Sequence, residues 1–295
     1  MIIELIKAVL YGIVEGITEW LPVSSTGHLI LLDEFLSLNV APELGAEFAA
    51  EFWSMFEVVI QLGAILAVVV MFFTKLNPFA LSKSLSERRA TWSMWGKVLV
   101  ASLPAAFFGI VFDKILEKIS GRDIDGWLYN AWVVAAALIV YGILFIIIEK
   151  YHKGKAAKIE DIDSISYGNA FVIGVFQMLA IIPGTSRSGS TILGSMMLGL
   201  SRTAAAEFSF FMAIPAMAGG SLIKALGFLS YVSKVGISVP AAAWIVLGVA
   251  SAVAFIVSMC AIKFLMDFVR RHSFSVFGVY RIILGALILG YFIFK

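Results

Sequence analysis

The sequence is poor in cysteine and in charge. Its 295 residues include one cysteine, Cys260, and only 14% are charged, against about 25% in soluble domains. A single cysteine excludes an intramolecular disulfide and a thiolate metal cluster. The formal charge of +2 is close to neutral and predicts no nucleic-acid partner. The chain is instead 61% hydrophobic with a mean hydropathy of +0.97, which is typical of a single polytopic membrane domain over residues 1–295.

Long apolar runs set the expected fold class. A helix that spans the bilayer needs about 20 predominantly apolar residues. Runs of this kind cover residues 55–73, 92–112, 132–148, 208–229, 240–263 and 277–294. We therefore expect an all-α integral membrane protein with six transmembrane helices.

Two further apolar regions, residues 3–38 and 168–200, are each interrupted near the middle by a polar stretch that contains proline. Each apolar piece is about half a bilayer long, which predicts re-entrant helix–loop–helix hairpins. The alternative is that each region is an ordinary span with a polar end. The pattern favours the hairpins.

Basic loops predict the orientation. Residues 74–97, 149–163 and 263–272 are rich in lysine and arginine and should lie in the cytoplasm. This assignment is self-consistent only if each hairpin returns to the side from which it enters, the first from outside and the second from the cytoplasm. The halves, about 1–150 and about 165–295, then form an inverted-topology repeat. Gly12-Ile-Val-Glu15 before Pro22-Val-Ser24-Ser25 resembles Gly174-Val-Phe-Gln177 before Pro183-Gly-Thr185-Ser186.

The first polar stretch carries two acids inside apolar sequence. A charged side chain at mid-bilayer costs about 2.5–3.5 kcal/mol on insertion scales, so such residues mark a site. Glu15 and Glu19 are four residues apart and share one helix face. Their repulsion requires a proton on one of them or a cation between them. A divalent ion that also binds substrate phosphates fits this pair, and a watery vestibule is the alternative.

Hydroxyls and an imidazole follow these acids. Pro22 ends the first half-helix, Ser24 or Ser25 is placed to cap the next, and Thr26 and His28 fall in its first turn. The start of a helix favours an anion. A simple capping role is the alternative for any one serine. Together these residues indicate a hydroxyl nucleophile or phosphate ligand beside an imidazole acid or base.

The second polar stretch is cationic. Arg187 supplies a forked cation that suits phosphate oxygens, and Ser186, Ser188 and Thr191 supply hydrogen-bond donors. The alternative is an ion pair of Arg187 with a glutamate of the first stretch, which is compatible with phosphate binding once substrate arrives. We expect the other nearby polar residues to support the site or end helices: Asp33, Glu34, Glu57, Gln61, Gln177 and Glu207. The residues thus predict a membrane-embedded site for a phosphorylated group, with or without a metal, open to the outside.

Both polar stretches resemble the signature motifs of the undecaprenyl-pyrophosphate phosphatase family, bacterial membrane proteins linked to bacitracin resistance. These stretches are residues 15–28 and 183–191, and residues 56–72 resemble the family's next span. The resemblance implies hydrolysis of undecaprenyl pyrophosphate to undecaprenyl phosphate and inorganic phosphate. It implies a Mg²⁺ or Ca²⁺ requirement, an outward-facing site in the bacterial cell membrane and an interdigitated inverted-repeat fold.

The motifs also suggest a role for each residue. The catalytic set is Glu15, Glu19, Ser25, His28 and Arg187, with Glu15 and Glu19 as metal ligands. The substrate-binding set is Ser24, Thr26, Ser186, Ser188 and Thr191. The attacking group stays open between Ser25 and water. The expected partners are the polyprenyl pyrophosphate and membrane lipid, and a homodimer is left open. An inverted repeat is also a transporter signature, so a flippase of polyprenyl phosphate is the rival function.

Overall fold

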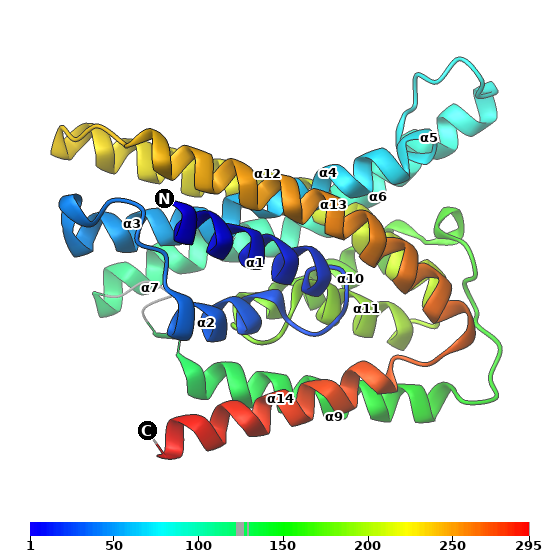
Figure 1. The fold of residues 1–295 in the computed structure, drawn as a ribbon. Helices are drawn as coiled ribbons and strands as arrows, with labels where there is room; N and C mark the ends of the chain where they lie inside the picture. Colours follow the sequence, from blue (N-terminus) through cyan, green and yellow to red (C-terminus); the bar gives the residue numbers. More distant parts are fainter. Residues whose placement is uncertain (122–126, 129, 295) are drawn as a thin grey trace.

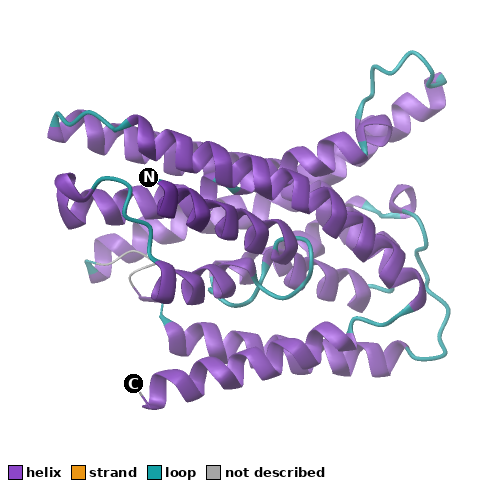
Figure 2. Cartoon of the chain, in the orientation of Figure 1, coloured by secondary structure: helices purple, strands orange, loops and turns teal. Residues whose placement is uncertain are grey.

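The computed structural model describes residues 1–121, 127–128 and 130–294 (Figure 1). Within these ranges the protein is helical, and its sole β pairing is an isolated bridge between Ile159 and Leu200 (Figure 2). The α-helices are α1 (Ile2–Thr18), α2 (Ser25–Leu36), α3 (Gly45–Val59), α4 (Gln61–Met71), α5 (Phe73–Leu76), α6 (Leu85–Phe107), α7 (Asp113–Ser120), α9 (Ala131–His152), α10 (Tyr167–Met178), α11 (Arg187–Met197), α12 (Arg202–Val235), α13 (Ala241–Arg271) and α14 (Ser275–Phe294). A π-helical turn, η2 (Phe108–Phe112), follows α6 directly.

Five helical segments of the described chain are long and apolar enough to cross a membrane, so the protein is a multi-pass membrane protein. They are Pro42–Met71, Ala131–His152, Arg202–Val235, Ala241–Arg271 and Ser275–Phe294. The sixth expected span, residues 92–112, falls on α6 and η2. The first turns of α6 carry Glu87, Arg88 and Arg89, which shortens its apolar part. Pro104 lies inside α6.

The expected span at residues 55–73 also differs from the structure. Its helix starts earlier, at Gly45, and is interrupted at Ile60, where α3 ends and α4 begins. Ile60 itself keeps helical dihedral angles (φ −60°, ψ −25°), so the interruption is slight, and no proline or glycine occupies that position. The break matters because residues on both sides of it line the cavity described below.

Two helix–turn–helix hairpins form at the interrupted regions. In the first, α1 and α2 meet at their outer ends, where Lys7 donates to the carbonyl of Ser37 at 2.7 Å and Glu4 accepts from the backbone N–H of Asn39 at 2.9 Å. In the second, the segment before α10 is joined to the segment after α11, because the Lys158 N–H donates to the Gly199 carbonyl at 2.9 Å. The hairpins enter from opposite ends of the molecule (Figure 1).

Packing of the two halves is mirrored. The first helix of each hairpin packs against a long helix of the other half, α1 on α13 and α10 on α6. A Cβ on Gly12 would lie 2.5 Å from the carbonyl oxygen of Ala250, and a Cβ on Gly174 would overlap the carbonyl of Ala101. Both contacts therefore require glycine at the matching position of the two hairpins. The remaining pair, α9 and α14, packs through Gly142 and Gly278, each facing the other's carbonyl oxygen.

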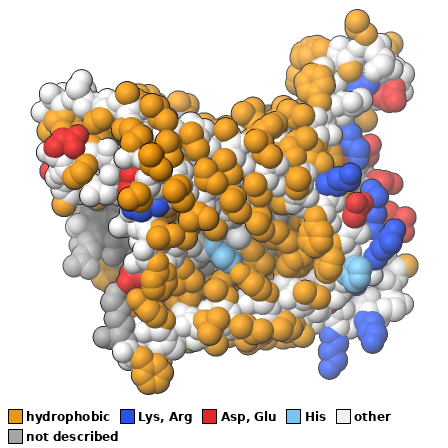
Figure 3. All heavy atoms as spheres, in the orientation of Figure 1, with side chains coloured by type: hydrophobic (Ala, Val, Ile, Leu, Met, Phe, Trp, Pro, Cys, Tyr) orange, Lys and Arg blue, Asp and Glu red, His pale blue; other side chains and the backbone are white. Residues whose placement is uncertain are grey.

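Apolar side chains cover the middle of the visible face, and charged side chains gather toward its two ends (Figure 3). All three basic loops lie at one end, whereas both termini lie at the other (Figure 1). The basic-loop end is held by Glu149, 3% exposed in its side chain, which accepts from Arg202 at 2.8 and 2.6 Å and from the backbone N–H of Phe274 at 2.7 Å.

Candidate active site

The turns of the two hairpins have the same backbone. Ser24 (φ 74°) and Ser186 (φ 71°) are the non-glycine residues with positive φ in the described chain. Each is the N-cap of the second helix of its hairpin, and its hydroxyl accepts from the N–H of Gly27 or Gly189 respectively. Backbone conformations that L-residues rarely adopt cost of order 1–3 kcal/mol each. Contacts elsewhere must therefore hold both turns in place.

Arg281 of α14 supplies those contacts. Its side chain is fully buried and reaches both turns at once. One terminal nitrogen donates to the carbonyl of Pro22 at 3.0 Å, and the other donates to the carbonyls of Gly184 and Thr185 at 2.8 Å each. Because these are backbone acceptors, Arg281 fixes the two turns relative to each other without using their side chains.

An ion pair then joins the turns through their side chains. Arg187 Nη2 donates to Glu19 Oε1 at 3.0 Å, with side chains only 13% and 6% exposed. The hydroxyl of Ser25 donates to the other oxygen, Oε2, at 2.6 Å. The hydroxyl of Ser188 donates to the Glu19 backbone carbonyl at 3.1 Å. The acidic turn of the first hairpin and the cationic turn of the second therefore lie in contact, as the sequence predicts.

Helix α12 supports Arg187 from behind. Arg187 Nη1 donates to the carbonyl of Ser209 at 2.6 Å, and the Ser209 hydroxyl lies 2.7 Å from the hydroxyl of Thr191. The ring of Trp20 lies 5.8 Å from the guanidinium carbon. These contacts set the direction of the guanidinium before any ligand binds.

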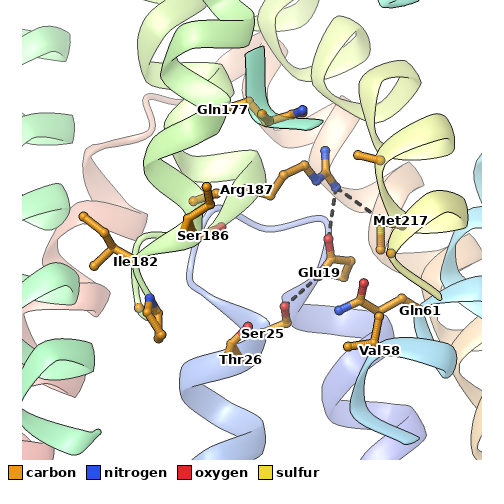
Figure 4. Close-up of a pocket in the computed structure, with 17 residues that line it drawn as sticks. Glu19, Ser25, Thr26, Val58, Gln61, Gln177, Ile182, Ser186, Arg187 and Met217 are labelled. Carbon is orange, nitrogen blue, oxygen red and sulfur yellow. Dashed lines mark hydrogen bonds and ion pairs between the residues drawn. The ribbon is translucent and has the colours of Figure 1, made fainter. Parts of the chain in front are cut away.

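A cavity of about 330 Å³ lies between the turns (Figure 4). Its polar wall consists of Glu19, Ser25, Thr26, Gln61, Gln177, Ser186 and Arg187. An adjoining cavity of about 800 Å³ shares Thr26, Gln61 and Pro183 and continues past Glu51, Ser54 and Lys224. Those last residues lie toward the start of α3 and the end of α12, so the space leads toward the end of the molecule that carries the termini.

Comparison with known proteins agrees with this geometry. The model of the bacitracin resistance protein BacA family matches residues 8–287. The chain belongs to the BacA family. It is 50% identical to undecaprenyl-diphosphatase 1 of Clostridioides difficile (strain 630), over 99% of this chain and 97% of that protein. It is also 50% identical to undecaprenyl-diphosphatase of Enterococcus faecalis (strain ATCC 700802 / V583), over 98% of each chain, and to that of Streptococcus mutans serotype c, over 99% and 97%.

Two of the five expected substrate-binding hydroxyls of this BacA family member line the cavity. Thr26 and Ser186 lie in its wall. Ser24, Ser188 and Thr191 are buried behind the wall, where they cap α2, hold the Glu19 carbonyl and contact Ser209. These three residues shape the site instead of facing it.

His28 makes its hydrogen bonds with residues other than Ser25. Its Nδ1 donates to the carbonyl of Ser24 at 2.7 Å, and in the neutral ring Nε2 then accepts from the hydroxyl of Tyr280 at 2.7 Å. The two rings are parallel, with centroids 5.7 Å apart. The Ser25 hydroxyl bonds to Glu19 instead. In this arrangement the proton acceptor next to Ser25 is Glu19.

Glu15 lies one helical turn before Glu19 and is fully buried, and neither of its oxygens has a hydrogen-bond partner in the described part of the chain. The nearest charges are those of Glu19, Glu57 and Arg187. The described residues contain no cluster of three or more typical metal ligands. Mg²⁺ commonly takes only one or two protein carboxylates and completes its shell with phosphate and water. Glu15 lines neither cavity, whereas Glu19 lines the smaller one, so the fit to a divalent ion rests on the unpartnered Glu15 oxygens and on their place one helical turn before Glu19.

Three polar residues lie closer to the cavities than the sequence predicts. Gln61 and Gln177, expected to be supporting groups, line the cavity itself. Glu57, expected in the same class, lines the adjoining cavity. Glu57 and Gln61 are four residues apart, as are Glu15 and Glu19, and this spacing was the available signal. Arg281 was missed altogether, although a lone arginine in an apolar run is itself a site marker.

Proposed function

We propose that the protein is an undecaprenyl-diphosphatase. It hydrolyses undecaprenyl pyrophosphate to undecaprenyl phosphate and inorganic phosphate, which recycles the lipid carrier for peptidoglycan and other envelope polymers and so confers bacitracin resistance. The observation that carries this proposal is the group of Arg187, Glu19 and Ser25 on one cavity wall between two turns. The printed names of the relatives agree with it.

The cavity offers the groups that phosphoryl transfer needs. The guanidinium of Arg187 exchanges its bond to Glu19 for the oxygens of the terminal phosphoryl group, which it can bind in a fork. Glu19, released from Arg187, accepts the proton of the Ser25 hydroxyl. The Ser25 oxygen bonds to phosphorus as the bridging P–O bond breaks, and undecaprenyl phosphate leaves. Water then releases phosphate from the serine.

Ser25 is preferred to water as the first attacking group because its hydroxyl already donates to a carboxylate held in place by a cation. Rapid-quench trapping tests this step. A phosphoserine at Ser25 is the expected result, whereas direct oxygen-18 transfer from water to phosphate without phosphoserine would assign the attack to water.

His28 and the metal have supporting parts in this proposal. His28 fixes the carbonyl of Ser24 and so holds the turn that presents Ser25. Glu15 and Glu19 would hold Mg²⁺ or Ca²⁺, which supplies positive charge to the phosphate oxygens when bound. The phosphate contact of Arg187 and the proton transfer to Glu19 are steps of these side chains themselves.

We further propose that the two hairpins are re-entrant and belong to an interdigitated inverted repeat with six spans. The mirrored packing of α1 on α13 and α10 on α6 supports this arrangement. With the basic loops in the cytoplasm, the larger cavity opens on the periplasmic or extracellular side. The diphosphate then meets the turns while the isoprenoid tail stays in lipid.

Purified protein in detergent tests the function directly, because no leaflets exist there. Phosphate release from a polyprenyl diphosphate is the expected result, and polyprenyl monophosphate should release none. A flippase would move lipid phosphate between leaflets of a vesicle and release no phosphate in detergent. An absence of phosphate release by folded protein supplied with Mg²⁺ or Ca²⁺ would overturn the proposal.

A further inference from the structure

Gln177 is a buried polar residue that faces the cavity without a partner. It is the penultimate residue of α10, is 3% exposed and lines the cavity between the turns. Its carbonyl oxygen Oε1 makes no hydrogen bond in the described structure. An unpaired buried acceptor costs about 1–3 kcal/mol. Because Gln177 lines the cavity, a ligand there could donate a hydrogen bond to Oε1 and so remove this cost.

A second unpartnered atom belongs to Arg187, a residue of the same wall. Arg187 Nε is buried and finds no acceptor among the described residues, although both terminal nitrogens of Arg187 are bonded. Figure 4 shows the Gln177 carboxamide and Glu19 on opposite sides of the Arg187 guanidinium. The wall therefore presents an orphaned acceptor and an orphaned donor. A single ligand that satisfies both must itself carry a hydrogen-bond donor and an acceptor.

The position of Gln177 in its hairpin explains why it is an amide. Gln177 precedes Ser186 by the same number of residues by which Glu15 precedes Ser24, and both side chains are buried with unpartnered oxygens. The first hairpin has a carboxylate at this place, and the second has a neutral amide. A neutral amide can lie beside a bound anion without repelling it, whereas a carboxylate would repel the anion unless a proton or a cation neutralised it.

We propose that Gln177 and Arg187 Nε form a subsite for a protonated phosphate group, with Oε1 accepting from a P–O–H and Nε–H donating to a P–O⁻ oxygen. This inference rests on the proposed function, in which the subsite would hold the product, inorganic phosphate. Inorganic phosphate keeps at least one P–O–H at neutral pH and fits both atoms. Sulfate has the same shape but no hydrogen to donate at that pH, so Oε1 would stay unpaired.

The test compares phosphate with sulfate as probes. Thermal unfolding of the full chain in detergent is followed at rising concentrations of each anion, because a ligand of the folded state raises the unfolding temperature. Gln177→Met removes the acceptor and conserves volume. Ser195→Ala is the matched control, because Ser195 is a buried, unpartnered residue of the second hairpin that does not line the cavity.

Wild-type protein should bind phosphate more tightly than sulfate by about tenfold or more, the worth of one hydrogen bond to a charged group. Gln177→Met should lose this preference, lower the rate of phosphate release by about 10–100-fold, and unfold at the wild-type temperature or above. Ser195→Ala should keep both preference and rate. An unchanged preference in Gln177→Met, an absence of preference in the wild type, or a lowered unfolding temperature that accounts for the lost activity would each overturn the subsite.

The two proposals fail separately. Wild-type protein that releases no phosphate from a polyprenyl diphosphate contradicts the proposed function. Wild-type protein that is active, with Gln177→Met equally active and equally selective, contradicts the subsite alone.

Discussion

The two hairpin turns share a backbone and differ in charge. Both place a serine at positive φ before a helix that this serine caps, and both give their carbonyls to Arg281. The first turn then contributes Glu19 and Ser25, whereas the second contributes Arg187 and an amide from Gln177. Equivalent backbones bring the turns together, and unlike side chains make the space between them reactive.

The end of the molecule that carries the basic loops shows what the same residue types do without a cavity. Arg202 forms an ion pair there with both oxygens of the buried Glu149, and Oε1 of Glu149 also accepts from the backbone N–H of Phe274. Each oxygen of that carboxylate ends on a structural donor. At the turns, Glu19 instead ends on a hydroxyl and a displaceable arginine. Breaking each pair should therefore give different phenotypes.

Within the acidic turn, the largest expected effect is at Glu19. Glu19→Gln keeps the shape but removes the charge that orients Arg187 and accepts the Ser25 proton, so phosphate release should fall by about 10³-fold. The unfolding temperature should fall as well, because Arg187 loses its buried partner. Phosphate release in detergent measures the rate. Activity within tenfold of wild type would remove Glu19 from the chemistry.

Substitution of Arg281 tests whether activity depends on the alignment of the two turns. Arg281→Met leaves three buried carbonyls without donors, at about 1–3 kcal/mol each, so both the unfolding temperature and the activity should drop sharply. Arg202→Met, at the other end, should lower the unfolding temperature while the folded fraction keeps its kcat. If Arg281→Met retains kcat once folded protein is counted, the turns do not depend on α14 for their alignment.

His28 should act through position. His28→Ala releases the Ser24 carbonyl and should lower kcat by about 10–100-fold, the cost of a small displacement of reacting groups. The shape of the pH–rate profile should not change, because Glu19 remains the proton acceptor. Tyr280→Phe, which frees only Nε2, should have a smaller effect. Loss of one limb of the profile in His28→Ala would assign proton transfer to the imidazole.

The smallest effects should come from the capping serines. Ser24→Gly and Ser186→Gly each relieve the positive φ and lose a cap, and replacing a serine cap by glycine costs only a few tenths of a kcal/mol. The free energy of unfolding should rise by about 0–1 kcal/mol in both variants. Ser24→Ala and Ser186→Ala should instead destabilise. Opposite signs for the two glycine variants would show that the backbones are not equivalent.

The sequence was sufficient for the parts of the site that local chemistry dictates. Charged groups in apolar sequence pointed to Glu19 and Arg187, and proline followed by serine pointed to the turns. The sequence does not reveal the rotation of a helix about its axis, and it therefore predicts only supporting roles for Gln61 and Gln177. The break at Ile60 lacks a local signal. The hydrogen bond from Tyr280 to His28 joins residues far apart in the chain, and only the folded structure reveals it.

The central claim is that Arg187 of the second hairpin acts in the reaction together with Glu19 and Ser25 of the first. The most direct test compares phosphate release by wild-type protein and Arg187→Ala in detergent. Polyprenyl diphosphate is the substrate, Mg²⁺ or Ca²⁺ is present, and Arg202→Ala is the matched arginine control. Arg187→Ala should be slower by about 10³–10⁵-fold, as for an arginine that stabilises phosphoryl transfer, while remaining folded. Arg202→Ala should stay within a few-fold of wild type per folded molecule. Equal rates for Arg187→Ala and wild type would contradict the account.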